Sequence, residues 1–221
     1  HVTVYADGFL NPQTPHIMQL LGELYPSIPK FSFNNCFDTN QFSYRSFPLV
    51  GGPKIAWVGR IEDNKNWREF LQIGHQLIHQ INSNIQLYMF EDPTIGDPKE
   101  RIQFKNLITQ LNLNKHLTLH SNVPNSEMAK YFSLVGDSGG FLCSTSKVEG
   151  APYSLLEAMS CKCPVLTTDS DGVRSSIIHD QTGKYYDLGN VSQAVQEANE
   201  LMNNHKLRAE IRLNALMHVK R

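Results

Sequence analysis

Short apolar runs alternate with longer amphipathic stretches over most of this 221-residue chain. A run of four to six apolar residues suits a strand that is buried on both faces, whereas apolar residues three and four positions apart suit one face of a helix. Parallel strands joined by helices produce this alternation, because each connection must cross back over the sheet. The pattern therefore predicts an α/β fold, with a Rossmann-like parallel sheet flanked by helices.

The expected strands are residues 2–6, 30–34, 54–58, 85–90, 117–119, 141–144, 164–167 and 184–186. The expected helices are residues 66–82, 98–112, 126–135, 153–160, 191–203 and 206–219. Asn125 is a good capping residue for the third helix, and residues 46–53 read as a linker. A chain of this length with 40% hydrophobic residues is able to bury a full core.

Composition excludes several functional classes. The net charge of −1, with acidic and basic residues interspersed, gives no footprint for nucleic acid or an acidic membrane. No apolar run approaches the length of a membrane span, and the first residues lack the order of a signal peptide. The chain is expected to be soluble and cytoplasmic, and work at the inner face of the membrane is left open.

The four cysteines, Cys36, Cys143, Cys161 and Cys163, show no disulfide framework. Cys161 and Cys163 are too few ligands for a closed zinc site. We expect reduced, mostly buried thiols.

Glu149 and Glu157 lie on either side of a predicted loop-to-helix boundary in the segment EGAPYSLLE. Pro152 suits the start of a helix, so that Glu149 belongs to the loop and Glu157 lies more than one turn into the helix. The N–H groups of the first turn form a seat for phosphate, and each carboxylate can accept two hydroxyl hydrogen bonds. The alternative is that both carboxylates are merely solvated.

Gly59 and Arg60 follow the strand expected at residues 54–58, and Lys65 comes five residues after Arg60. Open α/β sheets bind ligands at the carboxyl ends of their strands, so both cations would point into a cleft. Arg can fork two phosphate oxygens while Lys adds a point charge, which suits a diphosphate. The alternative is a pair of surface cations near Glu62 and Asp63.

The order of these motifs resembles the group 1 (family four) retaining glycosyltransferases of GT-B fold, over roughly residues 31–190. The matching positions are Asn35, Asp38, Phe42, Gly59, Arg60, Lys65, Glu149, Gly150, Glu157, Ala158, Met159, Pro164 and Val165. The resemblance implies the C-terminal, donor-binding domain of such an enzyme.

The resemblance also implies roles for individual residues. Arg60 and Lys65 would bind the donor's diphosphate, Glu157 the ribose, and Glu149 the transferred sugar and the positive charge that develops on it. Arg60, Lys65 and Glu149 are thus the expected catalytic residues. The full expected donor site is Gly59, Arg60, Lys65, Asn122, Val123, Glu149, Gly150, Ala151, Tyr153, Ser154 and Glu157.

The backbone amides of residues 151–154 would complete the phosphate seat, except that of Pro152, which has no N–H. The nucleobase would rest near residues 120–123, where backbone groups could read it; the alternative is that these residues merely form a turn.

Several positions depart from the family pattern. Cys36 and Asn66 stand where the family has Gly, residues 90–92 read Phe-Glu-Asp in place of Gly-Asp-Gly, and residues 171–175 lack the usual Pro and Glu. The charged residues Arg60, Lys65, Glu149 and Glu157 are all present, but the width of the pocket and the freedom of the backbone differ from the family pattern. The sequence therefore predicts neither the sugar nor the base.

The expected reaction moves a sugar from a nucleoside diphosphate sugar to a hydroxyl of a carbohydrate or lipid-linked acceptor, typically in polysaccharide biosynthesis, without a metal or other cofactor. Residues 1–30 are expected to be a hinge or the remnant of an N-terminal domain, residues 31–205 the donor domain, and residues 206–221 a C-terminal helix. The acceptor would bind through the absent N-terminal domain, so the chain alone would bind donor without transfer. Peripheral membrane association of the full-length enzyme is left open.

Two other functions stay open: a GT-B enzyme that epimerises or hydrolyses a sugar nucleotide, and a nucleotide-sugar-binding module without chemistry. A dinucleotide-dependent oxidoreductase is disfavoured, because no Gly-x-Gly-x-x-Gly follows any expected strand.

Two apparent metal motifs are expected to have no metal role. Asp169 and Asp171 imitate the Asp-x-Asp of another glycosyltransferase fold, one that uses a metal. His75 and His79 fall on the polar flank of an amphipathic helix and are expected to be solvated.

Overall fold

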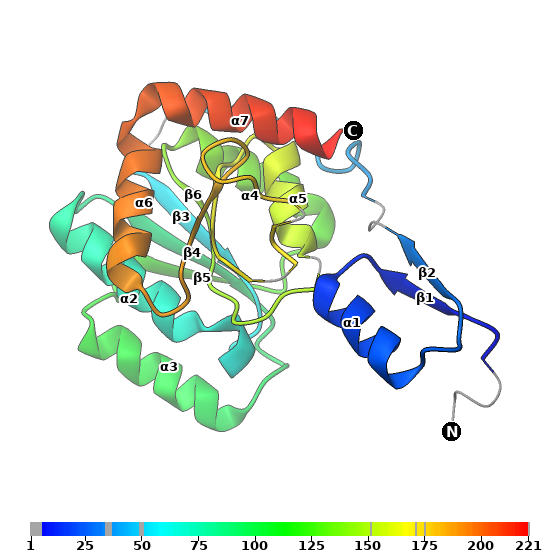
Figure 1. The fold of residues 1–221 in the computed structure, drawn as a ribbon. Helices are drawn as coiled ribbons and strands as arrows, with labels where there is room; N and C mark the ends of the chain where they lie inside the picture. Colours follow the sequence, from blue (N-terminus) through cyan, green and yellow to red (C-terminus); the bar gives the residue numbers. More distant parts are fainter. Residues whose placement is uncertain are drawn as a thin grey trace.

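The computed structural model describes residues 6–33, 37–48, 51–150, 152–170, 172–174 and 176–220. Its main feature is a six-stranded parallel sheet with the strand order β5-β4-β3-β6-β7-β8 (Figure 1). The strands are β3 (Lys54–Val58), β4 (Gln86–Glu91), β5 (Leu117–Ser121), β6 (Phe141–Ser144), β7 (Val165–Thr168) and β8 (Lys184–Tyr186). The sheet confirms the expected α/β fold.

The chain adds β4 and β5 on one side of β3, and then β6, β7 and β8 on the other. The order of the strands therefore reverses between β3 and β6. In an open parallel sheet, the carboxyl ends of the strands at such a reversal form a crevice where ligands bind.

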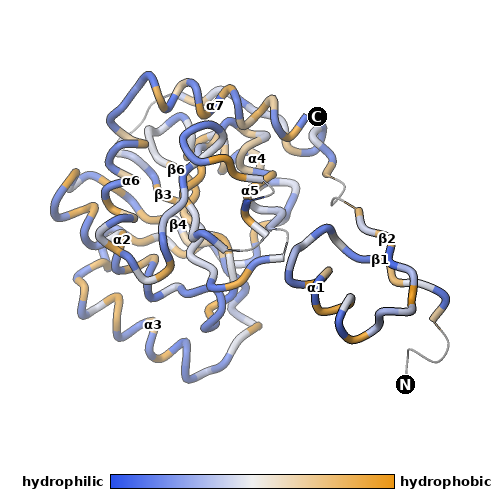
Figure 2. Tube along the Cα trace, viewed as in Figure 1, coloured by the Kyte–Doolittle hydropathy of each residue, from blue (hydrophilic) through white to orange (hydrophobic). Residues whose placement is uncertain are grey.

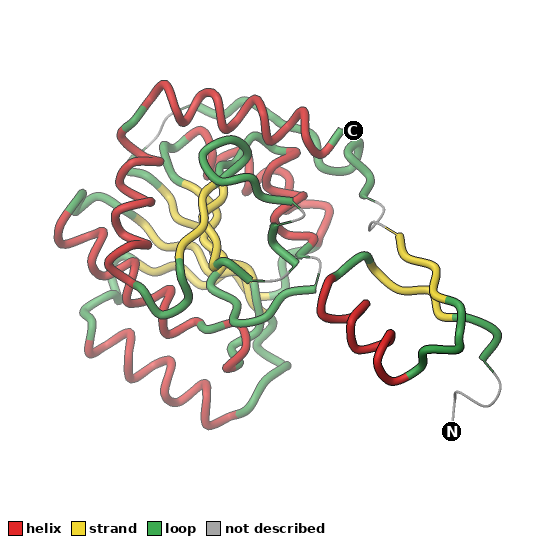
Figure 3. The backbone as a smooth tube through the Cα atoms, viewed as in Figure 1, coloured by secondary structure: helices red, strands yellow, loops and turns green. Residues whose placement is uncertain are grey.

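Helices cover both faces of the sheet, as the yellow strands enclosed by red helices in Figure 3 show. One face packs against α2 (Trp67–Gln80), α3 (Pro98–Gln110) and α6 (Val191–Asn203), and the other against α4 (Asn125–Asp137) and α5 (Tyr153–Ser160), with α7 (His205–Val219) running along α5 and α6. Side chains alternate along β3, so that Ile55 and Trp57 enter the first core and Ala56 the second. Burial on both faces explains why the strands read as apolar runs.

The N-terminal part of the chain forms a separate unit. Its two parallel strands, β1 (Phe9–Pro12) and β2 (Lys30–Phe33), are joined by α1 (Pro15–Leu24). Large apolar side chains remain exposed here, among them Leu24 at 58% and Phe31 at 63%. Figure 2 shows hydrophobic residues in α1, yet no residue of this helix is buried.

Most expected elements are confirmed. Strands 54–58, 141–144 and 184–186 and helices 153–160 and 191–203 agree to the residue, while β4 and β7 are shifted by one position and β5 is two residues longer. The strand expected at 30–34 forms as β2, and it pairs with β1 rather than with the main sheet. The expected strand at 2–6 lies almost wholly outside the described residues.

Two side-chain assignments were wrong. Asn125 does not cap α4: the helix begins at Asn125 itself, with Pro124 in the capping position and no capping hydrogen bond. His79 is exposed as expected, but His75 is half-buried and its Nδ1 lies 3.0 Å from the carbonyl oxygen of Leu111. The polar flank of α2 therefore contacts the end of α3.

The thiols of Cys143, Cys161 and Cys163 are free and buried, as expected, while Cys36 is outside the described residues. Burial raises the pKa of both Cys161 and Cys163 to about 12. Both thiols are therefore protonated at neutral pH. Among the described residues, no helix combines the length and apolar character needed to cross a bilayer.

A buried lysine holds the edge strand β8 in place. The ammonium of Lys184, whose side chain is 1% exposed, contacts Asp180 at 2.5 Å and Glu197 and Glu200 at 2.7 Å. Burial by itself lowers the pKa of Lys184, but hydrogen bonds to these three carboxylates outweigh it and the pKa is raised. A raised lysine pKa means that the stabilisation is complete below about pH 10, the ordinary range of lysine, and is lost only as the pH rises beyond it.

Replacing Lys184 by Met is expected to lower the free energy of unfolding by on the order of 2 kcal/mol, because three carboxylates lose their shared cation. The effect is smaller than for a fully enclosed pair, since Asp180 and Glu200 are half exposed. Urea denaturation at neutral pH, where the stabilisation by the Lys184 ammonium is complete, measures it. Lys206→Met, at an exposed position of α7, is the control. Equal stability of the two variants at neutral pH would contradict the assignment.

Candidate functional site

The carboxyl end of β3 places Gly59 and Arg60 beside the strand reversal. The Gly59 N–H donates to the Phe90 carbonyl oxygen at 3.1 Å, which continues the pairing with β4. A Cβ on Gly59 would lie 2.9 Å from the Trp57 ring and 3.1 Å from Cγ of Lys65. A side chain at this position would therefore have to displace the buried Trp57 ring as well as the stem of Lys65.

Lys65 ends a short 3-10 helix, η2 (Asp63–Lys65), and Asn66 follows it with φ +50°. This is the left-handed region, where Asn is among the least strained residues after Gly. Asn66 therefore keeps the backbone that a Gly would allow at this position. The side chain of Asn66 also donates to Glu69 Oε2 at 2.7 Å, which fixes the start of α2.

The loop after β3 is joined to the loop after β6. Asn64 accepts from the N–H of Lys147 through its carbonyl and exchanges two side-chain hydrogen bonds of 3.2 Å with the backbone of Val148. The hydroxyl of Thr145, 0% exposed, donates to the Lys65 and Asn66 carbonyls. The two loops thus form one rigid wall of the crevice.

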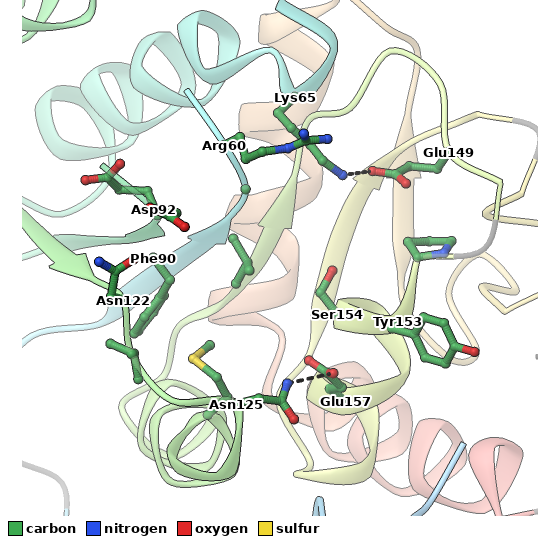
Figure 4. Close-up of a pocket in the computed structure, with 16 residues that line it drawn as sticks. Arg60, Lys65, Phe90, Asp92, Asn122, Asn125, Glu149, Tyr153, Ser154 and Glu157 are labelled. Atoms are coloured by element: carbon green, nitrogen blue, oxygen red, sulfur yellow. Dashed lines mark hydrogen bonds and ion pairs between the residues drawn. The ribbon is translucent and has the colours of Figure 1, made fainter. Parts of the chain in front are cut away.

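This wall brings Lys65 and Glu149 together. Lys65 Nζ lies 2.5 Å from Glu149 Oε1, and the two side chains are only 25% and 13% exposed. Arg60, by contrast, is 53% exposed and contacts Glu62 at 3.2 Å. Figure 4 shows Arg60 and Lys65 converging on the side of the crevice that faces Glu149.

The opposite wall is the first part of α5. Pro152 occupies the capping position, so the first helical N–H groups belong to Tyr153 and Ser154. The first N–H groups of a helix lack intrahelical acceptors and carry partial positive charge. Glu157 lies just over a turn deeper, half-buried; burial raises the pKa of its carboxyl, although a hydrogen bond from Asn125 lowers it.

These groups surround a hollow of about 550 Å³. Its lining is Val58, Gly59, Arg60, Lys65, Phe90, Glu91, Asp92, Asn122, Val123, Asn125, Met128, Glu149, Pro152, Tyr153, Ser154 and Glu157. The volume is within the usual range for small-molecule sites. The lining thus combines two cations on one wall, the first N–H groups of a helix on the other, and several apolar side chains.

Nine of the eleven residues expected in the donor site line this hollow. Gly150 does not: its carbonyl oxygen accepts a hydrogen bond from Thr14 Oγ1 at 3.0 Å, which ties the loop to the N-terminal unit. Ala151 lies outside the described residues. Asn35, from the motif before β3, is also outside them, while Phe42 is buried against the core of α4 and α5.

His120 and Ser121 support the hollow from behind. The His120 ring stacks on Phe90 with centroids 4.8 Å apart, and the Ser121 hydroxyl donates to Glu91 Oε1 at 3.2 Å. Glu91 is buried and also pairs with Arg101 at 2.7 Å. Burial lowers the pKa of His120, which favours its neutral form.

The expected donor site left out seven residues that line the hollow: Val58, Phe90, Glu91, Asp92, Asn125, Met128 and Pro152. Val58 and Phe90 end neighbouring strands, so their position relative to Gly59 was the available signal. Asn125 and Met128 open α4, and only the wrong capping assignment hid Asn125. Asp169 of the apparent metal motif pairs instead with Arg174 at 2.5 Å, and Asp171 is outside the described residues.

Known proteins share this fold and sequence pattern. The family described as glycosyl transferases group 1 matches residues 43–217. A 2-deoxystreptamine N-acetyl-D-glucosaminyltransferase of Niallia circulans is 23% identical over 167 residues, which are 76% of this chain and 40% of that protein.

Solved structures agree on the architecture. Sucrose-phosphate synthase from Thermosynechococcus elongatus superposes with a TM-score of 0.82 and 17% identity, over 95% of this chain and 53% of that one. Anabaena Alr3699/HepE, solved with UDP and glucose, gives 0.84 and 14%, over 98% and 59%. The C-terminal domain of the group 1 protein LpcC from Francisella tularensis gives 0.72 and 20%, over 84% and 97%.

The chain thus spans about half the length of the first two of these structures and 40% of the Niallia protein. With a family match over residues 43–217 and a parallel sheet of the matching architecture, the chain belongs to the group 1 glycosyltransferases and has the fold of a GT-B glycosyltransferase domain.

Proposed function

We propose that this chain binds a nucleoside diphosphate sugar and that the whole enzyme transfers the sugar, with retention of configuration, to a hydroxyl of a carbohydrate or lipid-linked acceptor. One observation carries the proposal: Arg60, Lys65, the start of α5 and two carboxylates line one hollow at the strand reversal. None of these groups is specific alone. Together, the cations and helix N–H groups suit a diphosphate, and the two carboxylates suit the sugar and the ribose on either side of it.

The diphosphate lies between Arg60 and Lys65 on one wall and the N–H groups of Tyr153 and Ser154 on the other. Two cations and the positive end of a helix neutralise the charge of the diphosphate. The same groups stabilise the additional charge that develops as the diphosphate leaves.

Glu149 holds the hydroxyls of the transferred sugar. Because Glu149 already contacts Lys65 at 2.5 Å, the ammonium lies where the sugar and the diphosphate join. A carboxylate here also stabilises positive charge at the anomeric carbon. Glu157, on the deeper side of α5, holds the ribose.

The nucleobase occupies the apolar end of the hollow, formed by Val58, Phe90, Val123 and Met128. The backbone near Asn122 supplies polar contacts, with Asn122 held at φ +53° by a hydrogen bond from its N–H to the Glu91 carbonyl. Anabaena Alr3699/HepE, which shares the fold, was solved in complex with UDP, and this supports a nucleotide as the ligand.

Retention follows from reaction on one face of the sugar. The bond between the anomeric carbon and the diphosphate oxygen breaks, and the acceptor oxygen forms its bond to the same carbon from the same side. The acceptor proton passes to the departing diphosphate. Arg60 and Lys65 then stabilise the negative charge of the nucleoside diphosphate product.

The acceptor binds to a part of the enzyme outside this chain. The exposed apolar side chains of α1 and β2, such as Leu24 and Phe31, support a further domain against the N-terminal unit. The chain alone then binds donor without transfer, and an enzyme-like transfer rate from it would contradict this division of labour.

Calorimetric titration with UDP, GDP and ADP tests donor binding. One of the three is expected to bind, and Glu157→Gln or Arg60→Ala should weaken it by about 1 to 3 kcal/mol, the scale of a lost charged hydrogen bond. Glu210→Gln and Lys105→Ala, at exposed positions of α7 and α3, are matched controls and should bind as the wild type does. Absence of binding by all three nucleotides, or equal loss in the controls, would contradict the proposal.

Gly172 tests whether the loop that carries Glu149 must stay in place. Its N–H donates to the Glu149 carbonyl at 2.9 Å, and a Cβ on Gly172 would lie 2.1 Å from the Gly150 carbonyl oxygen. Gly172→Ala should therefore displace the loop, cost about 1 to 3 kcal/mol of stability and weaken nucleotide binding. Gly22→Ala is the control, because an added Cβ there meets nothing within 4 Å. Wild-type affinity and stability in Gly172→Ala would show that the loop tolerates the shift.

A further inference from the structure

The side chain of Asn125, a residue type that often caps helices, does not cap α4. As the first residue of α4 it follows Pro124, and neither residue makes a side-chain capping bond to the helix. Its side chain points across the crevice, where Nδ2 lies 3.4 Å from Glu157 Oε1 (Figure 4). Asn125 thus connects the start of α4 to the carboxylate of α5.

The orientation of the Asn125 amide is set by a second contact. Gln41 Nε2 donates to Asn125 Oδ1 at 3.0 Å. Because the oxygen of the amide is engaged by Gln41, the NH₂ group faces Glu157. Gln41, which is distant in the sequence, therefore sets which atom of the Asn125 amide faces the Glu157 carboxylate.

Gln41 is itself anchored. Its neighbour Phe42 is 3% exposed within the core of α4 and α5, and the Phe42 carbonyl accepts a 2.5 Å hydrogen bond from Ser160 on α5. Farther along, the hydroxyl of Tyr44 donates to Asp137 at the end of α4. The segment 41–44 thus clasps α4 and α5 together, with Gln41 placed at the mouth of the hollow.

We propose that Asn125, oriented by Gln41, is a positioning residue that aims the Glu157 carboxylate at the two hydroxyls of the donor's ribose. The inference rests on the proposed function and names a residue of the same site. One lone pair of Oε1 accepts from Asn125, which leaves the other oxygen and the second lone pair of Oε1 for two neighbouring hydroxyls. Without Asn125, the carboxylate is free to rotate about its terminal torsion.

The pKa of Glu157 gives a readout that separates loss of the Asn125 donor from general loosening of the fold, because loosening would expose the carboxyl and lower this pKa. Burial raises the pKa of Glu157 and the Asn125 hydrogen bond opposes this. The other titratable groups facing Glu157 or its helix are Cys161 on α5, Arg45 near Cys161, and Arg60, Lys65, Asp92 and Glu149 around the hollow. Loss of the Asn125 donor therefore raises the pKa further, and the ionised form that grips ribose appears at higher pH.

The experiment compares the nucleoside diphosphate that binds among UDP, GDP and ADP with its 2′,3′-dideoxy analogue. The ratio of the two affinities isolates the ribose hydroxyls, and titration of the phosphates cancels because both nucleotides share them. Calorimetry between about pH 5 and 8 gives the ratio and the pH at which it rises.

Asn125→Asp is the decisive variant, because it keeps the shape of the side chain and a carboxylate suits a helix N-terminus, so the fold is preserved. It cannot donate when ionised and it repels Glu157. The ribose preference should fall by about tenfold and its pH midpoint should move upward. Asn125→Ala should show the same direction with a smaller pH shift, and Gln41→Ala a partial loss of preference. Asn106→Asp, at an exposed position of α3, is the control and should leave both unchanged.

Unchanged preference and midpoint in Asn125→Asp, with tight binding retained, would overturn the inference while leaving donor binding intact. A wild type that binds the nucleotide with no ribose preference would do the same. If the wild type binds no nucleoside diphosphate, the proposed function fails, and the role of Asn125 fails with it.

Discussion

The pocket depends on the joining of two loops across the carboxyl ends of β3 and β6. Asn64 bridges the backbone of the second loop, and the fully buried hydroxyl of Thr145 reaches back to the first. A buried hydroxyl without such partners would be costly, so these bonds hold the loops in one arrangement. The contact between Lys65 and Glu149 is consistent with this joining, because the joined loops hold the two backbones near each other.

The strand reversal decides where these loops meet. β3 and β6 are neighbours in the sheet although β4 and β5 separate them in the chain. The residues that follow β3 therefore face those that follow β6, with the start of α5 beside them. The N-terminal unit touches the same region through Thr14 and the Gly150 carbonyl, and the segment after it touches Glu157 through Gln41 and Asn125. Both contacts connect segments outside the main sheet to residues around the hollow.

Much of the fold was predictable from the sequence, because its strands are buried on both faces and read as apolar runs. The N-terminal unit was less predictable: a strand was expected at 30–34 but none at β1, and the pairing of β2 with β1 was missed. In the site, Arg60, Lys65, Glu149 and Glu157 were found from motifs at strand and helix ends. Asn125 was missed because local propensity favours a cap, whereas a tertiary contact with Glu157 takes its side chain instead.

The most direct test of a diphosphate held between two loops and a helix end is a crystal structure of the chain with the nucleoside diphosphate that binds it. The expected result is a diphosphate between the Arg60 and Lys65 side chains and the N–H groups of Tyr153 and Ser154, with the ribose against Glu157. A nucleotide bound elsewhere on the chain, or one that leaves Arg60, Lys65 and the start of α5 without contact to phosphate, would contradict the account.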